Sequence, residues 1–242
     1  MNSKLFYLVN GVFLLFLLVG TAHAKKKVYS PNVEKDEKEV EYYIDWLERS
    51  DNTTVINHEG EFSYGFSGKD KVAFYAVYED TNKNDIEFNK YKVEWIHHLF
   101  NQGKQSWNIG TYLEYQFNDA VTNKADKIEF KPLFTKTLDG TTLTINGIFE
   151  KEIGSNASND IEMGYAMRYA WHVNKSMMPA IEMFGDFGDI SDIKPTDQQS
   201  HIIGPVMKMK FSKHVGLHVG AFFGLTDNSE DIRVKSGIAY EW

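Results

Sequence analysis

Apolar side chains alternate with polar or small ones along most of the chain after residue 37. A two-residue period of this kind is typical of β-strands, whereas no segment beyond the N-terminus keeps the 3.6-residue apolar repeat of a long helix. The clearest examples run from Ile161 to Trp171 and from Ile232 to Trp242. Polar turns separate such segments about every 10 to 18 residues, so the chain is predicted to be an all-β meander.

Twelve segments carry this alternation. They span approximately residues 38–48, 60–67, 71–79, 86–99, 106–117, 127–136, 142–152, 161–172, 177–185, 201–211, 214–225 and 231–242. A tilted membrane strand needs ~9–11 residues, and an even number of antiparallel strands is typical of bacterial transmembrane β-barrels. The prediction is therefore an antiparallel transmembrane β-barrel of about 12 strands, with ten or fourteen as alternatives because strand boundaries are difficult to predict.

Aromatic residues favour a membrane barrel over a soluble β-sandwich, which also alternates. In the predicted register they gather at the two ends of the strands. One end has Trp107, Phe134, Trp171, Phe211 and Trp242, and the other has Trp46, Phe62, Tyr78, Phe117, Phe149 and Phe223. Two aromatic girdles at the membrane interfaces are typical of such barrels, and long and short connections also mostly alternate, as they do there.

The first 24 residues have the features of a secretory signal peptide. Lys4 precedes an apolar run from Leu5 to Val19, and Ala22-His23-Ala24 suits a cleavage site. The run is shorter than the ~20 residues of a spanning helix, but the lysines at 25–27 keep an uncleaved anchor open, because positive charge there disfavours translocation. The predicted organisation is a signal peptide over 1–24, a periplasmic arm over 25–37 and a barrel over 38–242.

Composition excludes several kinds of chemistry. The sequence has 26 basic and 34 acidic side chains, a formal net charge of -8, and no cysteine. Binding to nucleic acid is not expected of such a chain, and disulfides, thiolate metal sites and cysteine nucleophiles are impossible. His214 and His218 would lie ~13 Å apart on a strand, too far to share one ion. No metal site and no cofactor are predicted.

The predicted lumen carries opposed charges. Acidic positions dominate the earlier strands, and basic positions lie on the later ones. The lumen-facing candidates are Glu94, Glu114, Glu129, Glu150, Glu162, Arg168, Lys208, Lys210, Arg233 and Lys235. Opposed charges can orient a dipolar solute in a channel, or they can form ion pairs that plug a narrow barrel. A small acidic excess predicts a preference for cations or neutral solutes over anions.

The final strand, Ile238-Ala239-Tyr240-Glu241-Trp242, resembles that of bacterial outer-membrane β-barrel proteins, although a terminal Phe is commoner there. The resemblance implies that Tyr240 and Trp242 form an assembly signal that the barrel-assembly machinery reads. The stretch from Val28 to Lys35, followed by Glu39-Val40-Glu41, is similar to a poorly characterised group of such barrels described as transporters of the phenol-degradation meta-pathway kind. This second resemblance implies a transport role.

We therefore expect an exported, monomeric barrel in contact with outer-membrane lipid, which acts as a channel or transporter for an unidentified small solute. One alternative is an outer-membrane lipid-modifying enzyme. No His-x-Ser sequence of the kind used by twelve-stranded phospholipases occurs, and a dyad of Ser63 or Ser67 with a histidine would have to assemble across strands. The other alternative is a structural or surface-binding barrel with a closed lumen.

Overall fold

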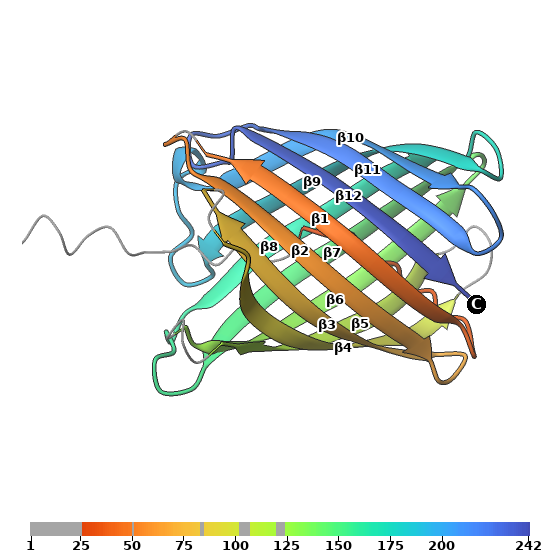
Figure 1. Ribbon diagram of the computed structural model, residues 1–242, viewed down its shortest axis with the longest axis horizontal. Helices are drawn as coiled ribbons and strands as arrows, with labels where there is room; N and C mark the ends of the chain where they lie inside the picture. Colours follow the sequence, from red (N-terminus) through yellow and green to blue (C-terminus); the bar gives the residue numbers. More distant parts are fainter. Residues whose placement is uncertain (1–25, 50, 83–84, 102–106, 120–123) are drawn as a thin grey trace, which may run out of the picture.

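Twelve antiparallel strands form a closed barrel in the computed structural model, which describes residues 26–49, 51–82, 85–101, 107–119 and 124–242 (Figure 1). The strands are β1 (Lys38–Glu48), β2 (Thr54–Gly65), β3 (Asp70–Thr81), β4 (Glu87–Asn101), β5 (Trp107–Asn118), β6 (Asp126–Leu138), β7 (Thr141–Ile153), β8 (Ile161–Trp171), β9 (Met177–Asp189), β10 (Ser200–Lys210), β11 (Val215–Gly224) and β12 (Ile232–Glu241). Each strand pairs with its neighbours in sequence, and β12 pairs with β1 to close the ring. A short 3-10 helix, η2 (Thr196–Gln198), precedes β10. No helix within the described residues is long and apolar enough to cross a membrane.

The predicted all-β class and strand number are confirmed, and two strands extend furthest beyond their predicted bounds. β2 begins at Thr54 rather than near residue 60, and β9 continues to Asp189. Polar Asn57 and His58 concealed the start of β2, although this part pairs fully with both β1 and β3. The loop between β1 and β2 is correspondingly shorter than the sequence indicated.

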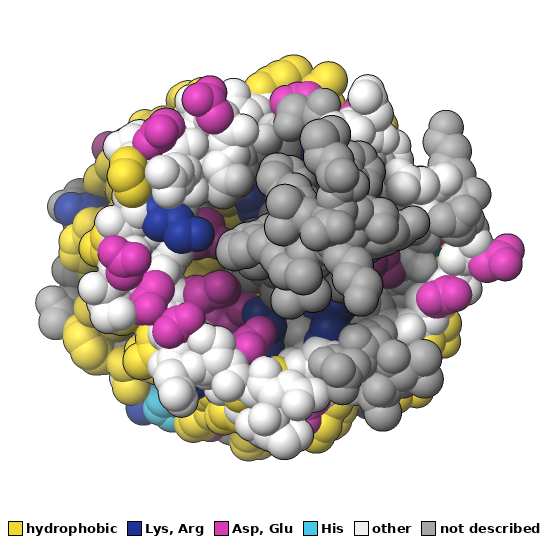
Figure 2. Space-filling view, turned by 90° about the vertical axis from the view of Figure 1, so that its left-hand side faces the viewer, with side chains coloured by type: hydrophobic (Ala, Val, Ile, Leu, Met, Phe, Trp, Pro, Cys, Tyr) yellow, Lys and Arg dark blue, Asp and Glu magenta, His cyan; other side chains and the backbone are white. Residues whose placement is uncertain are grey.

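The two faces of the barrel have the polarity that a bilayer requires. Large apolar side chains point outwards, and Phe74, for example, is 52% exposed, whereas the inward-facing Glu94 and Lys235 are each only 1% exposed. In the end-on view of Figure 2, apolar atoms lie around the rim and charged atoms lie in the mouth. An apolar outer band around a polar interior is the arrangement of a transmembrane barrel, the inverse of a soluble protein.

Two ends of the barrel can be distinguished by their connections. At the C-terminal end, defined by Lys38 and Glu241, the connections have two to five residues. At the opposite end, here called the loop end and defined by Glu48 and Thr54, they have five to ten. The aromatic prediction was wrong for Phe62. This residue lies at the C-terminal end, where its ring is 6.5 Å from that of Trp242, because β2 starts earlier than predicted.

Trp242 lies at the seam that closes the barrel. Its backbone exchanges hydrogen bonds of 3.0 and 3.2 Å with Lys38, and its exposed ring contacts those of Tyr240 and Phe62. Trp242→Ala removes the ring and leaves the backbone pairing, so we expect less folded, heat-modifiable barrel in the membrane. Electrophoresis of heated and unheated membranes measures this fraction. Phe211→Ala, an exposed aromatic at the same end but outside β12, is the matched control, and an equal effect of the two would contradict a specific role of Trp242.

Candidate functional site: an occluded lumen

The segment before β1 lies inside the barrel. Val28 and Tyr29 are buried against the inner wall, and only the last residues of the segment reach the C-terminal end, where the Asp36 backbone N–H donates to the Gly65 carbonyl at 2.7 Å. Residues 26–37 are called the arm below. Lys26, Lys27 and Tyr29 of the arm find partners on the lumen wall, and the periplasmic location predicted for residues 25–37 stays a prediction.

Polar contacts tie the arm to opposite parts of the wall. The Lys27 ammonium donates to Glu41 of β1 at 2.6 Å and to Glu61 of β2 at 2.8 Å. Across the lumen, the Tyr29 backbone N–H donates to the Asn146 amide oxygen at 2.8 Å, and the Asn146 amide nitrogen donates back to the Tyr29 carbonyl at 2.9 Å. This pairing satisfies the backbone groups of Tyr29, as buried polar groups require. The arm is therefore held in one register.

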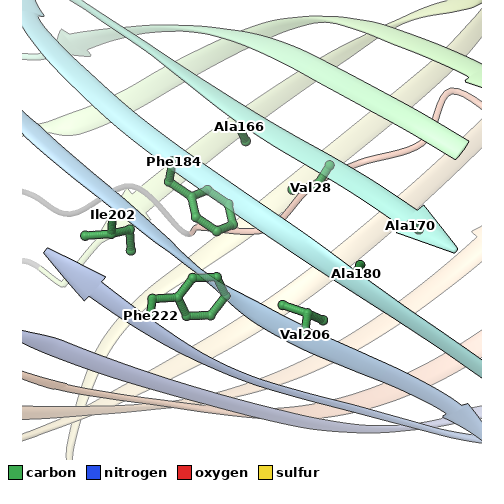
Figure 3. Packing of buried hydrophobic residues seen from close by; sticks show 8 residues of the cluster. All are labelled: Val28, Ala166, Ala170, Ala180, Phe184, Ile202, Val206 and Phe222. Atoms are coloured by element: carbon green, nitrogen blue, oxygen red, sulfur yellow. The ribbon is translucent and has the colours of Figure 1, made fainter. Parts of the chain in front are cut away.

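Two residues of the arm enter hydrophobic clusters inside the barrel: Tyr29 packs with Ile96, Tyr112 and Leu133, and Val28 enters a larger cluster. Val28 packs against the inward side chains of β8, β9, β10 and β11 (Figure 3). The other members are Ala166, Ala170, Ala180, Phe184, Ile202, Val206 and Phe222. This side of the lumen is thus partly apolar, and burial of Val28 stabilises the arm by about 1.5–3 kcal/mol, the usual range for a fully buried aliphatic side chain.

Two glycines let the arm lie close to the wall. A Cβ at Gly65 would be 2.0 Å from the Glu34 carbonyl oxygen, and one at Gly110 would be 2.7 Å from the Pro31 Cβ. Neither approach leaves room for a larger side chain. Small inward residues at these positions were visible in the sequence, and they are the signal that could have indicated an occupied lumen.

Most of the predicted lumen residues lie within the wall, and several of them form ion pairs, whereas Glu94 accepts a hydrogen bond from Tyr75 and Lys235 donates one to the Lys26 carbonyl. The buried ones are Glu94, Glu114, Glu129, Glu150, Arg168, Arg233 and Lys235. Lys208 is partly buried, whereas Glu162 and Lys210 are exposed near the loop end and the C-terminal end, respectively.

The partners of these residues come mostly from adjacent strands. The contacts include Lys92 with Glu114 at 3.5 Å, Lys131 with Glu129 at 2.5 Å, Arg168 with Glu182 at 2.6 Å, and Lys127 with Glu150. Sequence reasoning missed Lys127 and Glu182 as partners, although both lie on the inward face of their strands. The acidic excess expected from the sequence is largely compensated.

Arg233 forms the most enclosed ion pair cluster of the loop end. Its Nε donates to Asp45 at 2.8 Å, and a second guanidinium nitrogen donates to Glu230 at 2.6 Å. Lys26 of the arm also lies 3.2 Å from Glu230. The cluster therefore joins the arm, β1 and β12 at the loop end.

A cavity of about 540 Å³ remains between the arm and the wall. It reaches from Tyr29 and Glu94 to the turns at the C-terminal end, and Glu39, Lys208 and His218 line it. Its volume lies within the ~300–1,000 Å³ of small-molecule sites. The arm blocks part of the lumen but leaves this space.

The described residues bring together two other groups that resemble functional sites. The Ser67 hydroxyl donates to Asp70 at 2.6 Å, and the His97 ring lies 2.7 Å from the same carboxylate. Because Asp70 lies between them, His97 is not placed to take the proton of Ser67, as a nucleophile–base pair requires. Ser63, the other serine considered, is buried in the wall.

The carboxylates of Glu39, Glu41 and Glu61 each place an oxygen within 4.8 Å of the others. The Lys27 ammonium supplies a positive charge to this group. His214 and His218, excluded above as a metal pair, make separate contacts: His214 bonds to the Glu241 carbonyl at 2.7 Å, and His218 stacks on Tyr43.

Solved outer-membrane β-barrels share this fold at low sequence identity. The COG4313 outer membrane channel from Pseudomonas putida F1 has a TM-score of 0.64 and 10% identity, over 91% of this chain and 99% of that one. The β domain of the Bordetella autotransporter Brka has a TM-score of 0.50 and 9% identity, over 85% and 99% of the two chains. No family model and no curated protein sequence matches the chain. The likeness is one of fold.

The Arg233 cluster generates a stability prediction. Arg233→Met leaves the buried Asp45 without its guanidinium partner, and losing one member of a buried ion pair typically costs about 3–5 kcal/mol. We expect a loss of this size in the free energy of unfolding, measured by urea titration of the refolded barrel in lipid vesicles. The exposed Lys175→Met is the control and should change stability by under about 0.5 kcal/mol.

A triple variant tests the cause. Adding Asp45→Asn and Glu230→Gln to Arg233→Met removes the uncompensated charges and should restore part of the lost stability. If Arg233→Met behaves like the control, the cluster does not stabilise the barrel.

Proposed function

We propose that this protein is an outer-membrane channel or transporter for small solutes whose lumen the arm closes. The observation that carries the proposal is a charged inner wall with an inserted, non-covalently held segment and a cavity beside it. A barrel whose only task was structural would gain most from a fully packed interior. Here the interior retains space next to a segment that can be displaced.

The contacts of the arm are suited to release. They include ion pairs at Lys26 and Lys27, the amide pairing of Tyr29, single hydrogen bonds at Pro31 and Asn32, and the burial of Val28 and Tyr29. Most of the arm lies apart from the strand ladder of the barrel. Displacing it would therefore leave the twelve strands paired.

The compensated charge of the wall supports weak ion selectivity. Since selectivity depends on the charge at the narrowest point, the paired carboxylates described above should contribute little field. Glu39 and Glu162 lie near the two mouths of the barrel, and their negative charges should give a weak preference for cations over anions. The proposed lumen is mildly acidic.

The two alternatives have less support. Of the groups described above, Ser67, Asp70 and His97 most resemble a catalytic serine–histidine pair. Asp70 lies between the other two, so His97 cannot take the proton of Ser67. A permanently closed structural barrel would need the arm to stay in place under all conditions, which the locking experiment below tests.

The proposal includes an orientation in the membrane. The longer connections of such barrels face the outside of the cell, so Ser191, in the loop between β9 and β10, should be extracellular. We expect Ser191→Cys to react with an impermeant maleimide on intact cells, and Asp139→Cys, in the short β6–β7 turn, to react only after the outer membrane is ruptured. Both side chains are exposed, so the opposite result would reverse the orientation.

Closure by the arm is tested with a reversible lock. The natural chain has no cysteine, and the Asn108 amide nitrogen of β5 donates to the Asn32 amide oxygen of the arm at 3.2 Å. Because these two side chains meet, Asn32→Cys with Asn108→Cys should cross-link the arm to β5 after a small shift that brings the two Cβ atoms to the ~3.8 Å separation of a disulfide. We expect low single-channel conductance when the pair is oxidised and a severalfold rise after reduction.

The single-cysteine variants are the controls and should not respond to reduction. A second variant that lacks residues 26–35 should conduct without any redox dependence. If neither reduction nor this deletion opens the lumen to ions, the channel proposal fails and the closed structural barrel is favoured.

A further inference from the structure

We propose that the cavity beside the arm is a binding site for a small zwitterion that carries an amine at one end, a carboxylate at the other and an apolar body between them. This inference deepens the proposed channel role by naming the class of solute. It rests on three features of the cavity: an acidic wall, a basic wall and an apolar stretch between them.

The acidic wall comes from β1 and β2. The carboxylates of Glu39, Glu41 and Glu61 converge, and Lys27 pairs with the last two. Within the described part of the chain, Glu39 has no ion pair of its own, although Lys71 of β3 also lines the cavity and its charge acts on Glu39. Three carboxylates with the two ammonium groups of Lys27 and Lys71 leave a negative excess at this wall, which a further ammonium group can compensate.

The basic wall comes from β10. Lys208 lines the cavity from a strand three places round the barrel from β1, and its side chain makes no ion pair or hydrogen bond with a described residue. The charges of Arg168, Glu182 and Glu41 all act on it, but Glu182 pairs with Arg168 and Glu41 pairs with Lys27. A partly buried ammonium whose acidic neighbours are paired with other cations can take a further anionic partner. The carboxylate of a solute in the cavity would supply one.

Apolar side chains line the space between the two walls. Val28 and Tyr29 contribute from the arm, Ile96 from β4 and Met178 from β9. Charged residues alone would favour a fully hydrated ion, whereas this lining favours a solute with an apolar body. An aromatic amino acid has all three parts and fits in about 540 Å³.

Small residues of the wall keep the cavity open. Gly216, Gly237 and Ala239 line it at the C-terminal end. A Cβ at Gly216 would have only the Met209 carbonyl oxygen nearby, at 3.8 Å, which is an ordinary contact. A larger side chain can therefore be introduced at Gly216 to fill the cavity without displacing the backbone.

Isothermal titration calorimetry of the purified full chain in detergent tests the inference with three probes that share one body. L-phenylalanine carries both charges, phenethylamine lacks the carboxylate, and 3-phenylpropionate lacks the amine. We expect saturable binding of phenylalanine, with each analogue bound at least about tenfold more weakly, because each leaves one charged wall without a partner. Equal affinity for the three probes, or no saturable binding of phenylalanine, would overturn the proposal.

Variants assign the two charges. Lys208→Gln should reduce the affinity for phenylalanine to about that for phenethylamine, and Glu39→Gln should weaken both amines while leaving 3-phenylpropionate unaffected. Gly216→Leu should abolish binding with the barrel still heat-modifiable. Gly60→Leu, at an outward-facing position with open space around its Cβ, is the matched control and should bind normally. Unchanged binding by Gly216→Leu would place any site elsewhere and contradict the inference.

Binding and conduction are measured separately. Calorimetry detects the site whether or not solutes cross the barrel, so a binder that never conducts would contradict only the channel proposal. A conducting barrel without binding would contradict only this inference.

Discussion

The need to satisfy charged groups inside the barrel governs the rest of this structure. Every second side chain of a strand in a narrow barrel points into the lumen, away from bulk water, and an isolated charge there is strongly destabilising. The wall meets this requirement in part by pairing across neighbouring strands, as Lys92 does with Glu114 and Arg168 with Glu182. Where the wall lacks a counterion, the arm supplies it, as Lys27 does for Glu41 and Glu61. The arm thus contributes to the electrostatic balance of the barrel as well as to its closure.

Much of the fold could be predicted because strand geometry acts locally. A period of two follows directly from the alternation of side chains along a strand, so Ile161–Trp171 and Ile232–Trp242 were recognisable without any tertiary information. The start of β2 was not, because Asn57 and His58 interrupt the pattern and the strand is specified there by pairing with β1 and β3. The error then propagated, since it also placed Phe62 at the wrong end. Register depends on partners, which a single sequence does not display.

The candidate site was harder to predict than the fold because it is made of contacts between distant segments. The inward positions of Glu114, Arg233 and Lys235 follow from the alternation of side chains along a strand. The residues with which they interact do not follow from it. The arm has no periodic pattern, and the amide pairing of Tyr29 with Asn146 joins residues separated by 117 positions. Gly65 and Gly110 occupy inward positions of their strands, yet only the position of the arm shows what they accommodate.

Charged groups of the lumen that lack a partner therefore indicate function better than those that are fully paired. In the enclosed Arg233 cluster, the charged groups pair with one another. The role of this cluster is therefore to stabilise the barrel. The cavity at the C-terminal end differs, because Glu39 of β1 and Lys208 of β10 line one space and neither has an ion-pair partner among the described residues. The rest of the lining includes the apolar Val28 and Met178 and the small residues of β11 and β12. A solute that bridges the two walls would complete the charge pairing that the chain leaves open, and the arm, which contributes both Lys27 and Tyr29 to the same cavity, would respond to its arrival.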